Sequence, residues 1–170
     1  MGFRQDFLLH RNLGNGAFEE ISGAAGLRNV PLRSRRGAAF GDLNNDGLVD
    51  VVVTSLGELP TVFLNTTANP NRSVTLKLVQ PKYNRNAIGS RATLVTDKRT
   101  AIQEVEAGSS YLSQNDLRLH FGLAVDEKIQ SLEIRWSDGT VEKVSGLTAD
   151  RILTVQKGAG VIKTEEYRKR

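Results

Sequence analysis

Cysteine is absent from this sequence of 170 residues. A disulfide scaffold, a thiol nucleophile and a thiolate metal site are therefore all excluded. The absence does not settle the cellular compartment, because a protein without cysteine can be exported or retained.

Aromatic residues and long hydrophobic runs are also scarce. Phe, Trp and Tyr together make up 6% of the chain, and no window approaches the roughly 20 apolar residues that span a bilayer. The opening MGFRQDFLLHRN has a short apolar run and no small-residue cleavage pattern, so it is not expected to be a signal peptide. We therefore expect a cytosolic protein, or a mature piece or fragment of an exported one.

Positive charge is in modest excess, with a formal net charge of +4. The excess comes partly from RSRR, at residues 33–36, and from the closing KTEEYRKR. Neither run is interleaved with aromatic residues, so we expect solvated faces and a loose tail, and no nucleic-acid partner. Binding that weakens steeply with salt would instead indicate a nucleic-acid site at Arg33–Arg36.

Alternating apolar and polar residues are abundant, together with 16 glycines and 4 prolines. This pattern predicts an all-β protein with tight turns. The clearest hairpin is SLEIRWSDGTVEKVSGL, in which Asp138 and Gly139 suit a turn with positive φ. Further strands are expected in FLLHRN, FEEIS, DVVVTSLG, TVFLN, SVTLKLVQ, ATLVTDK, AIQEVEAG, LRLHFGL and RILTVQK.

Composition indicates where the chain divides. The segment TTANPNRS, at residues 66–73, has nothing to bury and is the best linker candidate. We expect a first part over 1–68, a compact β-sandwich or barrel-like module over 72–157, and a flexible charged tail over 158–170. LLHRN and VFLN form a faint repeat around an acidic loop, which suggests part of a propeller blade in the first part.

The acidic loop DLNNDGLVD places oxygen-bearing side chains at alternate positions. Calcium takes about six to eight oxygen ligands and tolerates irregular geometry. We predict a calcium site, because carboxylates this close together repel one another without a cation. Its ligands would be the side chains of Asp42, Asn44, Asp46 and Asp50 and the carbonyl of Leu48.

This loop begins like an EF-hand but is a different loop. An EF-hand has an acid at its twelfth position, where this chain has Val53, and it has helices on both sides, where this chain has the strand-like VVV. Gly47 permits the sharp turn. Two alternatives stay open: an Asx-rich turn without an ion, and magnesium, which demands tighter octahedral geometry.

Residues 8–65 resemble a known repeat. LLHRNLGNGAFEEISGAAGL followed by RRGAAFGDLNNDGLVDVVV is similar to the FG-GAP, or VCBS-type, repeat of integrin-like β-propellers. The resemblance implies the same calcium loop, with Phe40 and Gly41 as the aromatic-glycine pair that packs the strand entering it. The family's full set of repeats is absent, which puts closure of a propeller in doubt.

A second resemblance covers residues 72–157. NRNAIGSRATL, EVEAGSSYLSQNDLRLHFGL and LEIRWSDGTVEKV resemble the ASPIC/UnbV domain of the cartilage acidic protein and UnbV family. In that family the domain follows FG-GAP repeats, and some members are encoded near enediyne biosynthesis genes. The resemblance implies a binding or adhesion module at or outside the cell surface.

No convergent acid, base and nucleophile are found in this second block. His120 alternates with Leu119 and Phe121 and is expected to be structural, and Ser109 and Ser110 do not lie in a G-x-S-x-G elbow. We therefore predict no catalytic residues.

The polar run GSSYLSQND is a candidate binding loop. Tyr111, Gln114 and Asn115 are residue types that suit glycan or peptide contacts. A packed structural loop is the alternative.

Together these features predict a calcium-binding, non-catalytic binding or adhesion module, the C-terminal part of a larger β-propeller protein. We expect an extracellular, periplasmic or cell-surface location and a protein or glycan ligand. An exposed blade edge would also allow a homo-oligomer. The alternative is an enzyme or accessory protein in bacterial secondary metabolism of the enediyne type.

Overall fold

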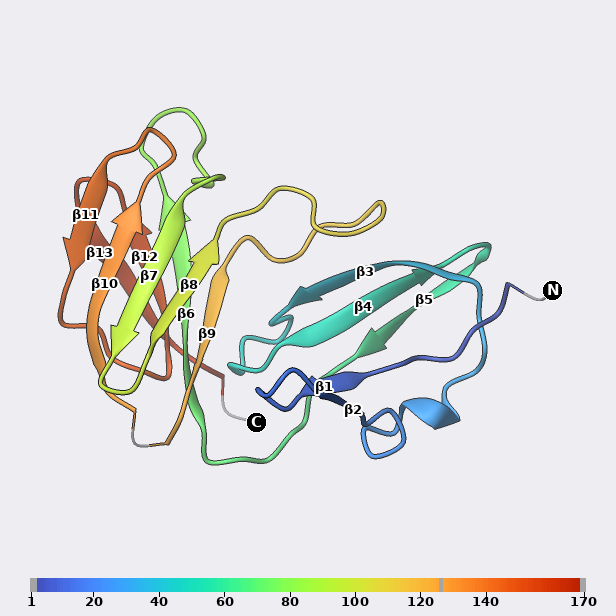
Figure 1. The fold of residues 1–170 in the computed structure, drawn as a ribbon. Helices are drawn as coiled ribbons and strands as arrows, with labels where there is room; N and C mark the ends of the chain where they lie inside the picture. Colours follow the sequence, from blue (N-terminus) through green and yellow to red (C-terminus); the bar gives the residue numbers. More distant parts are fainter. Residues whose placement is uncertain (1–2, 126, 169–170) are drawn as a thin grey trace.

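The computed structural model describes residues 3–125 and 127–168, and it confirms the all-β prediction (Figure 1). The described residues form β-strands joined by turns and loops, with one short 3-10 turn, η1 (Leu27–Asn29). The strands divide into sheets that do not mix residues from before and after residue 70.

The later part is a sandwich of two four-stranded sheets, ordered β11-β10-β7-β8 and β13-β12-β6-β9. Residues from both sheets form one hydrophobic core, as expected for a sandwich-like module. The strands are β6 (Arg72–Val79), β7 (Arg91–Thr96), β8 (Thr100–Glu104), β9 (Leu119–Leu123), β10 (Ile129–Arg135), β11 (Val141–Val144), β12 (Arg151–Gln156) and β13 (Gly160–Glu166).

Alternation explains strands such as β7, whereas β6 and β12 each bury four successive residues. In β7, Ala92 and Leu94 are both fully buried, whereas Arg91, the first residue of the strand, is exposed. The predicted hairpin joins β10 to β11, with Gly139 at a φ of 87° in the turn. One pairing is parallel, between β6 and β12, and it joins the beginning of the module to its end.

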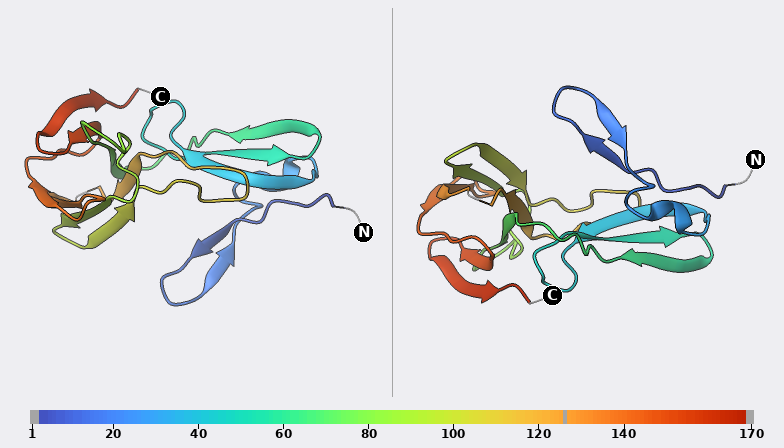
Figure 2. Two further views of the ribbon diagram at one scale, coloured as in Figure 1. Left: turned by 90° about the horizontal axis from the view of Figure 1, so that it is seen from above. Right: turned by 90° about the horizontal axis from the view of Figure 1, so that it is seen from below.

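The earlier part is thinner. A hairpin of β1 (His10–Asn12) and β2 (Phe18–Glu20) projects away from a three-stranded antiparallel sheet, as Figure 2 shows. That sheet comprises β3 (Arg35–Gly41), β4 (Asp50–Ser55) and β5 (Glu58–Phe63). Among the described residues before β6, Val53 is the one buried hydrophobic side chain.

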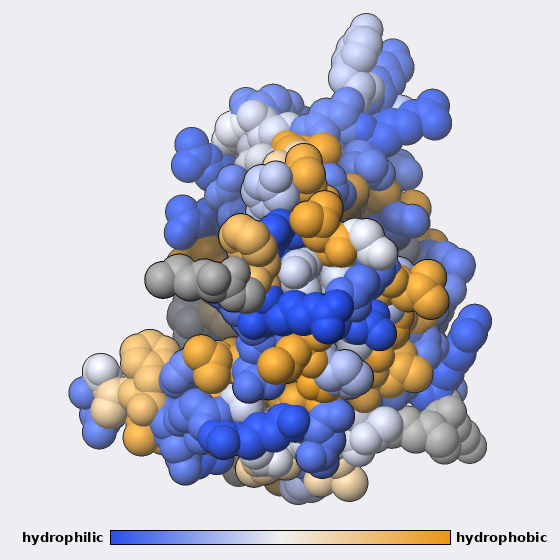
Figure 3. Space-filling model, turned by 90° about the vertical axis from the view of Figure 1, so that its right-hand side faces the viewer, coloured by the Kyte–Doolittle hydropathy of each residue, from blue (hydrophilic) through white to orange (hydrophobic). Residues whose placement is uncertain are grey.

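Hydrophobic residues accordingly lie at the surface of this earlier part. Figure 3 views the molecule from that side and shows hydrophobic patches between hydrophilic rows. Leu56, Leu59 and Leu64 are 66%, 80% and 57% exposed, respectively. The sheet therefore has little core of its own.

The expectation of a flexible charged tail over 158–170 is wrong for the described part of that segment. Gly160–Glu166 forms β13, which pairs antiparallel with β12 and completes one sheet of the sandwich. β13 is an edge strand whose residues are mostly exposed, so its sequence can be charged without losing its backbone pairing. Residues 169–170 lie outside the described residues.

A long loop of the module, residues 107–118, reaches along β3 (Figure 1); we call it the arm. The N–H of Asp116 donates to the carbonyl of Phe40 at 2.8 Å. The N–H of Phe40 donates to Oδ1 of Asn115 at 3.0 Å, and the hydroxyl of Ser113 donates to the carbonyl of Ala38 at 3.0 Å. The arm thus covers the outer edge of β3 and joins the two parts.

Candidate functional site

The predicted calcium loop, residues 42–50, connects β3 to β4 and faces the module. Two of its carboxylates are buried: Asp42 is 5% exposed and Asp50 is 1% exposed. The carboxylate of Asp42 accepts hydrogen bonds from the N–H groups of Asp46, at 3.1 Å, and Gly47, at 2.8 Å. Asp42 therefore closes the loop onto its own backbone.

The other acidic and amide side chains of the loop also accept hydrogen bonds from backbone N–H groups. Asp50 accepts from the N–H groups of Leu43 and Asn65, at 2.9 and 2.8 Å, which ties the loop to the end of β5. Asn44 accepts from the N–H of Asp46, and Asp46 accepts from the N–H of Leu48. The contacts of Asn44 and Asp46 are Asx turns, and they hold the loop in a fixed curve.

The loop's backbone depends on two residues in the left-handed region. Asn45 has a φ of 60° and Gly47 a φ of 85°. Asparagine and glycine adopt this conformation more readily than other residues. The role expected for Gly47, to permit a sharp turn, fits this geometry.

The donor set agrees in chemical type with calcium, since the loop presents carboxylate, amide and carbonyl oxygens. Each carboxylate oxygen that accepts one N–H keeps a further lone pair. Within residues 3–125 and 127–168, however, no group of three or more His, Asp or Glu side chains is arranged to hold a metal ion. In this arrangement the carboxylates are directed at the loop's amides, and calcium binding stays a prediction.

The module contacts the loop through Arg118, at the end of the arm. Its guanidinium donates to Oδ1 of Asn45 at 2.6 Å and to the carbonyl of Asp42 at 2.7 Å. It also pairs with Asp116 at 2.5 Å. One side chain therefore joins the loop to the arm.

The segment after β13 contacts the other side of the loop. A Cβ atom added to Gly47 would lie 2.8 Å from two ring carbons of Tyr167, so the ring lies directly against the glycine. The N–H of Arg168 donates to the carbonyl of Asn45 at 2.7 Å. Only glycine fits between the loop and this ring.

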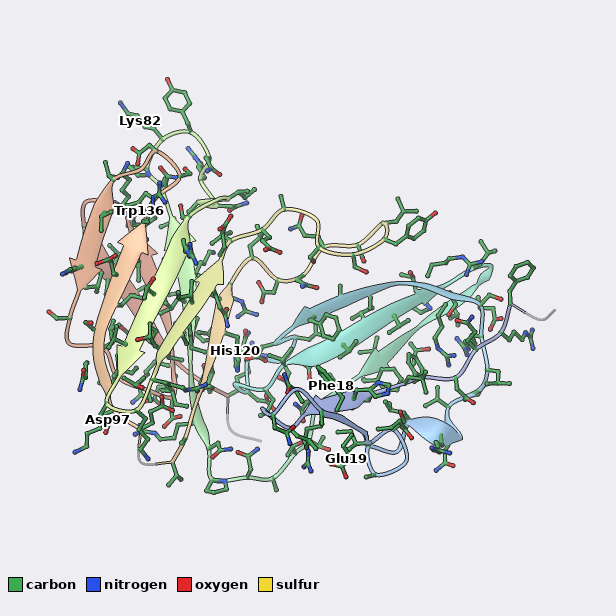
Figure 4. All side chains as sticks on the ribbon, in the orientation of Figure 1. Phe18, Glu19, Lys82, Asp97, His120 and Trp136 are labelled. Atoms are coloured by element: carbon green, nitrogen blue, oxygen red, sulfur yellow. The ribbon has the colours of Figure 1, made fainter. Side chains whose placement is uncertain are left out.

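A chain of hydrogen bonds links the loop to His120. The hydroxyl of Ser73 donates to the carbonyl of Gly47 at 3.1 Å and also contacts the Tyr167 hydroxyl at 3.1 Å. The Tyr167 hydroxyl lies 2.8 Å from the hydroxyl of Thr75, which lies 3.2 Å from Nδ1 of His120. Figure 4 shows His120 where the module meets the earlier part.

Burial has the largest effect on the pKa values of His120 and Tyr167. It lowers the pKa of His120 below its usual value, while Asp42 acts in the opposite direction and Arg118 in the same direction. Burial also raises the pKa of Tyr167. The raised pKa keeps Tyr167 a neutral phenol at neutral pH, and the lowered pKa favours the neutral form of His120.

A cleft of about 260 Å³ lies beside His120, between the arm and β8. Its lining includes Phe40, Glu104, Asp116 and His120. Asp116 pairs with Arg118, and His120 contacts Thr75 through Nδ1. Asp116 and His120 therefore each hold a partner within the protein, and the structural role of His120 stays a prediction.

The structure separates the three predicted binding residues. Tyr111 is 64% exposed at the tip of the arm, and Gln114 is exposed. Asn115, by contrast, accepts a hydrogen bond from the backbone of β3 through its side-chain oxygen. The arm is thus partly the packed structural loop that was the alternative, because even at its tip the Tyr111 carbonyl lies against Gly37 of β3, and only the side chains of Tyr111 and Gln114 are exposed.

Sequence reasoning missed Arg118 and Tyr167. Arg118 was included only as one residue of a strand-like run, and Tyr167 fell within the expected tail. Both act across long distances in the sequence, 73 residues in the case of the Arg118–Asn45 contact. No local pattern marks such a contact.

Comparison with known proteins concerns mainly the module that carries these residues. Residues 80–162 match the family described as ASPIC and UnbV. The matched range includes the arm and ends within β13, after its first three residues. It supports the second of the two resemblances, and the FG-GAP resemblance of residues 8–65 stays a prediction.

The chain is also similar to cartilage acidic protein 1. It is 30% identical to the Xenopus tropicalis protein over 109 residues, which cover 62% of this chain and 16% of that protein. It is 26% identical to the Mus musculus and Homo sapiens proteins over 136 residues, which cover 78% of this chain and 20% of each. This chain thus spans a fifth or less of these relatives.

The longer of these alignments extends beyond the family match. An alignment of 136 residues cannot fit within residues 80–162, so it includes residues outside that range.

Among the described residues, no helix has the length and apolar character to cross a membrane.

Proposed function

We propose that this chain is a calcium-binding, non-catalytic binding module, the C-terminal part of a larger β-propeller protein that works outside the cell or at its surface. The observation that carries the proposal is the loop at 42–50, where Asx turns preform a curve lined with oxygen donors. The match of residues 80–162 to the ASPIC and UnbV family is the second support for the proposal.

The residues that would hold calcium are those predicted from sequence: Asp42, Asn44, Asp46, Asp50 and the carbonyl of Leu48. When bound, calcium neutralises the charge of the carboxylates and fixes the loop by ligation to oxygen. The chain itself supplies the rest, because backbone N–H groups orient Asp42 and Asp50 before any ion arrives.

The exposed tip of the arm is the proposed surface for a protein or glycan ligand. Tyr111 and Gln114 face solvent there, whereas Asn115 serves to anchor the arm on β3. An aromatic ring on a loop that is anchored to β3 offers a large contact area with few rotatable bonds.

Thermal melting with calcium and with a chelator tests the calcium proposal. An ion that binds only the folded state stabilises it by about 2.7 kcal/mol at about 100-fold excess over Kd. We expect calcium to raise the melting temperature of the native chain and of Asp6→Ala, a matched control outside the loop, but not of Asp46→Ala. An equal melting temperature with calcium and with chelator in the native chain would refute the proposal.

A further inference from the structure

We propose that one end of the module binds an acidic polysaccharide. The site comprises Arg91 of β7, Arg135 of β10 and the loop at residues 80–90 that joins β6 to β7; we call it the cationic end. It lies outside the acidic loop and the arm, and it uses none of the residues proposed to hold calcium. Two arginines without partners, a polar hollow and a strained loop with an exposed aromatic ring meet there.

The two arginines lie directly opposite each other on the antiparallel strands β7 and β10. Both Arg91 and Arg135 are exposed, and neither side chain has a hydrogen bond or an ion pair within residues 3–125 and 127–168. Like charges that face each other across a sheet are destabilising. An anionic group bound by both guanidinium groups would remove this repulsion and accept charge-assisted hydrogen bonds.

A hollow of about 250 Å³ lies beside the two arginines. Its polar walls include Arg91, Glu104, Arg135 and Ser137, and its aromatic residue, Trp136, is 1% exposed. Guanidinium groups donate to oxyanions, and a carboxylate such as that of Glu104 accepts from hydroxyl groups. The hollow therefore offers partners both for the acidic groups and for the hydroxyl groups of a sugar.

The loop at 80–90 is fixed against the turn that follows β10. The hydroxyl of Ser137 accepts from the side-chain amides of Gln80, at 3.0 Å, and Asn84, at 3.1 Å. Asn84 also donates to the carbonyl of Ile88 at 2.7 Å and accepts from its N–H at 2.9 Å. The loop is therefore held in one conformation, which lowers the entropy that a ligand must overcome on binding.

The same loop is strained. Three of its residues other than glycine have positive φ: Tyr83 at 36°, Asn84 at 41° and Ala87 at 53°. Positive φ is unfavourable for a bulky residue, and such strain clusters at functional positions. Tyr83 is 91% exposed, so its ring gains little from packing within the protein. A contact with a ligand would give this strained, exposed ring a role.

The cationic end carries further positive charge beside this ring. Lys82 and Arg85 lie on either side of Tyr83 in the sequence, and both are exposed. Figure 4 shows Lys82 projecting from the loop at this end of the module. Asp138, an acid of the neighbouring turn, is already paired with Lys157. Positive charge is therefore in excess there, and it would attract an acidic ligand.

These features fit an acidic polysaccharide better than a nucleic acid or a peptide. The carboxylate of Glu104 accepts from sugar hydroxyls but would repel the continuous phosphate charge of a nucleic acid. A peptide takes most of its affinity from apolar anchors in pockets, whereas this hollow has polar walls. The exposed ring of Tyr83 offers an apolar surface to the C–H face of a sugar ring.

Surface plasmon resonance on immobilised heparin and hyaluronan tests the proposal with the full chain. Heparin carries sulfate and carboxylate groups, hyaluronan carries carboxylate groups without sulfate, and neutral dextran is the control surface. We expect binding to heparin that weakens as salt is added, and no binding to dextran. Binding to hyaluronan as well would show that a carboxylate suffices, whereas binding to heparin without hyaluronan would assign recognition to the sulfate.

Arginine variants locate the site. Arg91→Ala and Arg135→Ala should each weaken binding about tenfold, because hydrogen bonds to a charged group are lost. Arg36→Ala is the matched control, since it removes an exposed arginine of β3 and should leave the affinity unchanged. Arg135→Lys should lie between the native chain and Arg135→Ala, because lysine keeps the charge but not the planar fork. Circular dichroism confirms that each variant is folded, and the lysine variant decides if an alanine variant is not.

Tyr83→Asn tests the ring separately from the fold. Asparagine adopts a positive φ more readily than tyrosine, so the melting temperature should not fall. Binding to heparin should weaken all the same, because the exposed ring is lost. A lower melting temperature with unchanged binding would instead assign Tyr83 a structural role and remove it from the site.

Two results would overturn the proposal. The first is no binding to either polysaccharide, or equal affinities of Arg91→Ala, Arg135→Ala and Arg36→Ala. The second is tighter binding to single-stranded DNA or to polyglutamate than to heparin and hyaluronan, which would assign the cationic end to another class of ligand. Calcium binding is measured independently by thermal melting, so neither result decides the proposed function.

Discussion

Leu59 on β5 is 80% exposed, whereas Leu94 on β7 is fully buried, and each is typical of its part of the chain. The module closes a core between two sheets, while the sheet of β3, β4 and β5 has one layer. A single layer buries few side chains, so the earlier part depends on hydrogen bonds, on Asx turns and on the module. Stability and the candidate site thus reside in different parts.

The largest effect should come from the module's core. Phe121 is 2% exposed, and truncation to alanine should cost about 3–5 kcal/mol of unfolding free energy because it leaves a cavity. Leu59→Ala, at an exposed position, should change stability by no more than about 0.5 kcal/mol. Denaturant unfolding followed through the single Trp136, which is 1% exposed in the module, measures both. Equal losses of unfolding free energy in Phe121→Ala and Leu59→Ala would contradict this difference between the two parts.

Glu127 should give the next effect, and it also belongs to the module. It is 3% exposed and accepts hydrogen bonds from the Thr96 hydroxyl, the N–H of Ala124 and Arg99. These bonds, that of Thr96 foremost, lower its pKa from 4.5 to about 2. Replacement by glutamine should cost about 1.5–3 kcal/mol, since hydrogen bonds to a charged group are lost.

The pH dependence of this effect has a definite sign. Because the pKa is lower in the folded than in the unfolded state, the stabilisation is complete above pH 4.5 and is lost as the pH falls through about 2. Melting temperatures of the native chain and Glu127→Gln should therefore converge across this window. Curves that stay parallel would assign the acid sensitivity to other groups.

Gly47 should give the smallest of the three effects, and it tests the joint between the parts. Alanine there must adopt a positive φ, at about 1–2 kcal/mol, and its Cβ would collide with the Tyr167 ring. Gly57→Ala is the matched control, since it shares a positive φ, at 68°, but has open space around it. Hydrogen exchange at the amides of residues 42–50 should rise in Gly47→Ala and not in the control.

Alternation was enough to predict strands that bury every second residue, as β7 does with Ala92 and Leu94. The apolar runs of β6 and β12, which each bury four successive residues, were also visible in the sequence. Alternation failed for β13, where an edge strand carries exposed charges on a backbone that still pairs with β12. The acidic loop was visible because its pattern lies within nine successive residues. Its partners were not, because Arg118 and Tyr167 meet it only in the folded chain.

The arm also shows that residue type alone does not predict the role of a side chain. Tyr111, Gln114 and Asn115 were grouped by residue type, but the fold gives them different tasks. Asn115 is held against the backbone of Phe40, which no composition rule indicates. Residue type identifies what a side chain can bind, and the position of its neighbours decides what it does bind.

The parallel pairing of β6 with β12 has a consequence for how the chain folds. Val74 pairs with Arg151 and Val79 with Gln156, so the first strand of the module, β6, pairs with its second-to-last strand, β12. Such distant pairing must overcome the entropy of closing a long loop, which slows folding. On the ribosome the sandwich cannot be completed until β12 has emerged, and until then the edge of β6 is open to other strands. Emergence of β12, more than formation of any early hairpin, therefore sets the moment at which this edge of β6 is covered.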